Sequence, residues 1–228
     1  MNPSSSAPAD LKVVELCVQG MTAEAEGRNS DARGLFQRAW DIAADDYEAC
    51  VAAHYLARHQ PTPEATLRWN ETCLALADRV GDERVRGFHP SLHGTIGRAH
   101  LDLGRPAEAR AHFEAAAGRL ADVPPGPYAD WLRLCIARGL RATAPEAASG
   151  HGDPGTGTDP LRPLLARLCA RADLEALSLL LPPYMGNLHR PEDEERLTGT
   201  LRMLHAERRL PEADQALLGE VISLRAGA

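Results

Sequence analysis

The sequence predicts an almost wholly α-helical protein. Apolar residues recur along most of the 228 residues at the i, i+3, i+4, i+7 spacing of an amphipathic helix. Signals for strands are scarce, because only 4% of the residues are aromatic and alternation of apolar and polar residues never persists. A pattern of small and aromatic residues also occurs three times at one spacing, which indicates a repeated structural unit.

Short segments that contain Gly, Pro and charged residues separate the predicted helices. Such residues end helices because Pro lacks a backbone donor and Gly favours turns. We expect helices of about 12 to 18 residues between these breaks. The breaks are "EGRNSD" at 26–31, "HQPTP" at 59–63, "VGDERV" at 80–85, "LGRP" at 103–106 and "VPPGP" at 123–127.

Two segments are too poor in large apolar residues to order themselves. Residues 143–160 are rich in Gly, Pro, Ala, Ser and Thr, so we expect a flexible linker there. Residues 1–10 are expected to be a disordered N-terminus. The chain between them, residues 11–142, is predicted to be one helical repeat domain.

Residues 161–228 are predicted to form a helical C-terminal region. Pro191 and Pro211 each occupy a suitable first helical position. Pro182 and Pro183 are expected to end an earlier helix, because proline interrupts the hydrogen-bond ladder.

The composition makes several classes of protein improbable. A net charge of −7 provides no overall attraction to nucleic acid. The five cysteines form no CxxC pair, and no apolar run is long enough to span a membrane. The first residues also lack the pattern of a signal peptide. We therefore predict a cytoplasmic protein that binds neither nucleic acid nor membrane.

The repeated pattern explains how pairs of helices could pack. A small residue late on one helix lets a second helix cross closely, and an aromatic residue on the second helix fills the adjacent space. Each repeat is therefore expected to be a helical hairpin. The offsets of 12, 4 and 3 residues occur in Gly20, Ala32, Phe36 and Ala39, in Ala53, Ala65, Trp69 and Thr72, and in Gly97, Ala109, Phe113 and Ala116.

This pattern resembles the tetratricopeptide repeat (TPR). Gly27 and Gly104 stand where that family has a glycine in the turn between helices. The middle unit departs from the pattern at Gln60 and Thr72, so we expect a looser crossing there. Residues 60–142 are also similar to uncharacterised actinobacterial TPR proteins. The resemblance covers residues 11–142.

The resemblance implies antiparallel helical hairpins stacked into a right-handed superhelix. Residues 161–228 show no matching offsets, and one interpretation is that they cap this array. The concave surface of such an array usually receives a peptide on the first helix of each hairpin. Positions carried over to that surface are Cys17, Met21, Glu24, Tyr47, Cys50, His54, Arg58, Ser91, Arg98, Asp102, Trp131 and Arg138.

Six of these residues form the predicted ligand-binding groove: Tyr47, His54, Arg58, Arg98, Trp131 and Arg138. His54, Arg98 and Arg138 occupy corresponding places in successive units. Such a line of donors suits a protein or peptide that is acidic or has a free carboxylate, because an arginine fork can bind a carboxylate through two hydrogen bonds. The alternative is a solvated face with scattered charges.

Two chemical alternatives also arise from the sequence. His89, His93 and His100 have spacings that could place imidazoles on one helical face, as a metal site requires. We expect buried, hydrogen-bonded histidines instead. Cys50 and His54 lie one turn apart but lack a catalytic signature. We therefore assign no catalytic residue, no metal ligand and no cofactor.

The sequence favours a non-catalytic adaptor or scaffold that binds a protein or peptide, with a regulatory role as one option. The alternative is a helical enzyme or a metal-dependent accessory protein that uses the histidine-rich third repeat. The sequence leaves the oligomeric state open.

Overall fold

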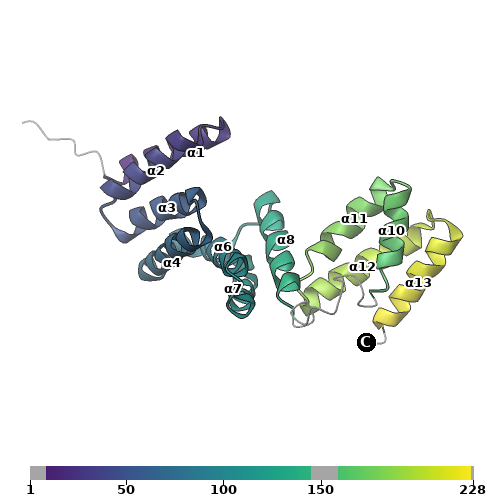
Figure 1. Cartoon of the computed structure of the whole chain (residues 1–228). Coiled ribbons are helices and arrows are strands. Elements are labelled where there is room, and N and C mark those ends of the chain that lie inside the picture. The colour runs from purple at the N-terminus through teal and green to yellow at the C-terminus, as the bar shows by residue number, and fades with distance from the viewer. Residues whose placement is uncertain (1–8, 145–158, 227–228) are drawn as a thin grey trace, which may run out of the picture. The chain divides into compact units, whose positions relative to one another are not determined.

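A computed structural model of the protein describes residues 9–144 and 159–226 (Figure 1). Within these residues the regular structure is entirely helical, as the apolar spacing predicts, and there are no strands. Residues 1–8 of the expected disordered N-terminus, and residues 145–158 of the expected linker, lie outside the described residues. Ala9 and Asp10 already belong to the first helix.

The chain divides into two compact units, Met1–Leu132 (unit 1) and Arg133–Ala228 (unit 2). The division falls inside helix α8, Pro127–Ala142. Each unit is described below by itself.

In unit 1, helices that are neighbours in sequence pack against one another. Contacts join α1 to α2, α3 to α4, and α6 to α7, and further contacts join α2 to α3 and α4 to α6. The helices before α8 are α1 (Ala9–Ala25), α2 (Asn29–Ile42), α3 (Asp46–Leu56), η1 (Ala57–His59), α4 (Pro63–Val80), α5 (Glu83–Arg86), α6 (His89–Asp102), α7 (Pro106–Gly118) and η2 (Leu120–Asp122).

Two of the predicted close crossings are present in unit 1. A β-carbon on Gly20 would collide with the ring of Phe36, and one on Gly97 would lie 3.1 Å from both the ring of Phe113 and the backbone oxygen of Ala109. Both phenylalanines are buried. The first and third repeats therefore use the same contact between a glycine and an aromatic ring.

The middle repeat is shifted by one residue from the predicted alignment. Asn70 and Cys73 occupy the buried positions of α4, whereas Trp69 is half-buried and Thr72 is exposed. The short helix η1 follows α3 directly, and α4 begins at Pro63. The predicted equivalence of Trp69 with the two phenylalanines is therefore wrong. Trp69 instead packs edge-on against Trp40 of α2, with ring centroids 5.0 Å apart.

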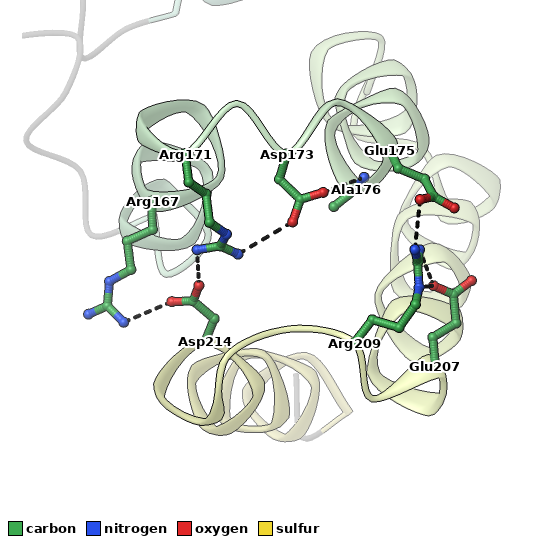
Figure 2. A network of polar contacts seen from close by, with 8 residues as sticks. All are labelled: Arg167, Arg171, Asp173, Glu175, Ala176, Glu207, Arg209 and Asp214. Carbon is green, nitrogen blue, oxygen red and sulfur yellow. Dashed lines mark hydrogen bonds and ion pairs between the residues drawn. The ribbon is translucent and has the colours of Figure 1, made fainter.

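The described residues of unit 2 form part of α8 and four further helices. Leucines from all four of these helices form its core. The buried carboxylate of Asp214 on α13 accepts hydrogen bonds from Arg167 of α10 and from Arg171, which directly follows α10 (Figure 2). The four helices are α10 (Arg162–Ala170), α11 (Leu174–Met185), α12 (Pro191–Glu207) and α13 (Glu212–Ala226).

Proline positions in unit 2 match the prediction only in part. Pro191 begins α12 as expected, whereas α13 begins one residue after Pro211. The expectation that Pro182 and Pro183 end a helix is wrong, because α11 continues through both to Met185. Proline leaves the carbonyls four residues earlier, on Ser178 and Leu179, without a donor. Both residues are exposed, so water can satisfy these carbonyls.

Among the described residues, no helix has the length and apolar character needed to cross a membrane.

Candidate functional site

Arg98 lines a hollow of about 220 Å³ in unit 1. The wall of the hollow comes from α6 and from the start of α4 with the turn before it. Three threonines contribute to this wall, Thr62, Thr66 and Thr95, together with Asp102. Hydroxyl groups beside a guanidinium and a carboxylate make this a polar surface that could exchange hydrogen bonds with a ligand.

The Arg98 guanidinium is already paired. Its Nε lies 2.9 and 3.1 Å from the two carboxylate oxygens of Asp102, one turn later on the same helix. The Arg98 side chain is 65% exposed. Exposed pairs at this i, i+4 spacing contribute only about 0.3–0.5 kcal/mol. A carboxylate from a partner could therefore replace Asp102 at small cost.

Arg58 is also held by neighbouring groups. Its Nη2 donates to Oε2 of Glu24 over 2.6 Å, and its guanidinium carbon lies 4.9 Å from the centre of the Tyr55 ring. His59 is hydrogen-bonded to the same carboxylate, with its Nε2 2.8 Å from Oε1 of Glu24. The cation at Arg58 is thus largely compensated within unit 1.

His54 cannot act as a charged donor at neutral pH. Its ring stacks on Phe88 with centroids 4.9 Å apart, and its Nδ1 is buried without a hydrogen-bond partner among the described residues. Burial, with a smaller effect from the charge of Arg58, lowers the pKa of His54 to about 4. His54 therefore contributes aromatic packing to this part of the molecule.

The other predicted groove residues have separate environments. The guanidinium of Arg84 lies 4.3 Å from the centre of the Tyr47 ring. Trp131 is 56% exposed and stacks on Tyr128 with centroids 5.9 Å apart. Arg138 is exposed on the part of α8 that belongs to unit 2.

Two cysteines expected on the concave surface are core residues instead. Cys17 and Cys50 are both buried. Cys50 lies against Cys73, with the two sulfur atoms 3.7 Å apart, and burial raises the pKa of the Cys17 thiol to about 11. These thiols pack as small apolar groups, so the sequence position alone misplaced them.

A row of four histidines runs between α6 and α7, and we call it the histidine row. His93 and His112 face each other at its centre, with their Nδ1 atoms 3.0 Å apart. The His89 ring centroid lies 6.5 Å from that of His93, and the His100 ring stacks on His112 with centroids 5.4 Å apart. His112 was not predicted as a member of this group, because the histidine spacing applies within one helix and this residue lies on the next.

Neutral imidazoles are favoured along most of this row. Burial lowers the pKa of His93 to about 4, and the charge of His112 acts in the same direction. Burial also lowers the pKa of His89 and of His112. His89 and His100 are buried, and their Nδ1 atoms have no hydrogen-bond partner within the described part of the chain. The expected buried histidines are present, but only the central pair has its Nδ1 atoms bonded.

Comparison with known proteins identifies no relative: no family model, no curated protein and no solved structure matches this chain.

Proposed function

We propose that unit 1 is a non-catalytic array of TPR-like hairpins that binds a protein or peptide, as an adaptor or scaffold. The observation that carries the proposal is the recurrence of one helix crossing. Gly20 meets Phe36 in the first hairpin as Gly97 meets Phe113 in the third. Recurrent crossings stack hairpins into an array, and arrays of this kind present extended binding surfaces.

The surface around Arg98 supports the peptide-binding part of the proposal. An extended peptide needs partners for its backbone and side-chain polar groups, and the hollow offers threonine hydroxyls beside Arg98. The exposed Tyr128 and Trp131 add aromatic area, which is enriched at the centres of protein interfaces. We therefore place the partner along the first helices of the hairpins.

The charge of His54 and the ion pairing of Arg98 indicate what kind of partner this surface would bind. His54 is neutral and stacked, so it offers contact area and no charge. Arg98 can accept a new carboxylate because its bond to Asp102 is exposed and weak. We propose an acidic peptide or one with a free C-terminal carboxylate as the ligand. Within unit 1, Arg58 and Tyr47 complete the proposed groove.

Selection from a random peptide library on the immobilised full-length protein tests this function. The proposal expects enrichment of peptides with acidic residues or with an acidic C-terminus. Each enriched peptide should be synthesised with a free and with an amidated C-terminus, because only a terminal carboxylate ligand loses affinity on amidation. Failure of every round to enrich any sequence, or enrichment of basic peptides, would contradict the proposal.

A further inference from the structure

The central pair of the histidine row brings two imidazole nitrogens from different helices close together. The Nδ1 atoms of His93 and His112 lie 3.0 Å apart and come from two different helices. A Zn²⁺ ion bound by two imidazoles at 2.0–2.1 Å in tetrahedral geometry requires about 3.3 Å between the nitrogens. The two nitrogens are therefore within a few tenths of an ångström of the required separation, and the rings must also rotate so that both lone pairs point to one ion.

The protonation state of the pair also suits a metal. Metal binding needs neutral imidazoles, and the hydrogen bond between the two Nδ1 atoms requires one of them to be the acceptor nitrogen of a neutral ring. One ring of a neutral pair donates its Nδ1–H to the other. When that proton moves to Nε2 of the same ring, both Nδ1 lone pairs are free, so the pair takes up a metal without releasing a proton.

The charges that act on the pair are mixed. Glu71 acts on His112 in the direction that favours a cation, and Asp78 acts on His93 in the same direction. Arg119 acts on His93 in the opposite direction. At His93 the effect of Arg119 is larger than that of Asp78, so Glu71 beside His112 is the carboxylate that most favours a divalent cation here.

We propose that His93 and His112 bind one divalent transition-metal ion of the zinc, nickel or copper class through their Nδ1 atoms. Imidazole is a ligand that all three ions accept. Among the described residues no group of three His, Cys, Asp or Glu side chains is arranged around one ion, so water completes the coordination. The ion joins α6 to α7, and the proposal does not depend on peptide binding.

Isothermal titration calorimetry with Zn²⁺ and Ni²⁺, on the full-length protein without a histidine tag, tests the site. We expect one saturable site per chain at pH 7.5. His93→Asn and His112→Asn should each weaken binding at least tenfold, since even residues that only orient a metal ligand change affinity by about 10–100-fold. The matched control is His189→Asn, because His189 is 73% exposed and lies in unit 2. This control should bind as the unchanged protein does.

If a variant fails to fold, an NMR measurement on the unchanged protein can still test the site. Paramagnetic Ni²⁺ or Cu²⁺ added below one equivalent should broaden the NMR signals of the His93 and His112 rings before those of His189. Absence of saturable binding, equal affinity in a folded His93→Asn or His112→Asn protein, or first broadening at His189 would each overturn the proposal.

Discussion

Gly97 and Phe113 are in contact where α6 crosses α7, so that a β-carbon on Gly97 would lie 3.1 Å from the phenylalanine ring. The backbone oxygen of Ala109 lies at the same distance and cannot rotate away. The two helices of the third hairpin therefore approach too closely at this position for any residue with a side chain. The same close approach occurs in the first hairpin between Gly20 and Phe36.

The substitution Gly97→Ala should destabilise the protein. The added methyl group overpacks the crossing, and overpacking costs about 1–3 kcal/mol. Gly34→Ala is the matched control, because Gly34 lies in α2 and a β-carbon added there would meet nothing within 4 Å. Since alanine favours helix over glycine, this control should be neutral or stabilising. Urea unfolding measures both, and equal effects of the two substitutions would argue against the close crossing.

The structure also predicts a fall in stability on acidification. His54 and His93 have their pKa lowered to about 4 by burial, whereas unfolded histidine titrates near the ordinary value of 6.5. Between these values the unfolded chain binds more protons, so the free energy of unfolding decreases as pH falls below about 6.5. The more deeply buried His54 contributes a slope of about 1.4 kcal/mol per pH unit in this range, and the partly exposed His93 contributes less.

His54→Phe isolates one of these groups. Phenylalanine preserves an aromatic contact with Phe88 and cannot bind a proton, so the fall between pH 7.5 and 5.5 should be smaller by about 1 kcal/mol. Urea unfolding at a series of pH values provides the comparison. Carboxylates titrate in both proteins and cancel in the difference. Parallel pH profiles would show that His54 is not held neutral by burial.

In unit 2, the buried Asp214 should matter more than the exposed Glu175. Burial alone would raise the pKa of Asp214, but hydrogen bonds from Arg167 and Arg171 outweigh it and lower that pKa (Figure 2). Asp214→Ala removes both bonds, and hydrogen bonds to charged groups contribute about 1.5–3 kcal/mol. We expect a loss of stability in that range by thermal or urea unfolding.

Glu175→Ala is the control in the same region. Glu175 accepts from Arg209 over 2.7 Å, but its side chain is 69% exposed. Exposed ion pairs are screened by water and often have no measurable effect on stability. If the two alanine variants unfolded alike, burial of the Asp214 carboxylate would not be the source of its stabilising effect.

The helical class and the two crossings that involve glycine could be predicted from the sequence, because the spacing of small and aromatic residues directly encodes them. The register of the middle hairpin could not. Asn70 and Cys73 occupy buried positions of α4 one residue after the predicted ones, and the 12, 4 and 3 spacing in the sequence contains no sign of this shift. Asn70 is acceptable there because its side chain donates to the carbonyl of Thr66.

The candidate site was predictable in part. The i, i+4 spacing of Arg98 and Asp102 was a readable signal that this arginine has a local partner. The burial of His54, Cys17 and Cys50 depends on packing between helices, which a single-helix pattern does not contain. The meeting of His93 with His112 likewise requires the pairing of α6 with α7.

The central claim is that unit 1 binds a peptide at the surface that contains Arg98, and the affinity of one enriched peptide for two arginine variants tests it most directly. Arg98→Ala should weaken binding by about 2 kcal/mol, or roughly 30-fold, if Arg98 is an interface hot spot. Arg138→Ala is measured alongside it as a separate test of the predicted residue in unit 2.

The matched control is Arg33→Ala, because Arg33 is exposed on α2 and outside the predicted groove. Circular dichroism should first establish that all variants are folded. The account predicts a large loss of affinity in Arg98→Ala and unchanged affinity in Arg33→Ala. Equal affinity of the unchanged protein and the Arg98→Ala variant for the peptide would contradict it.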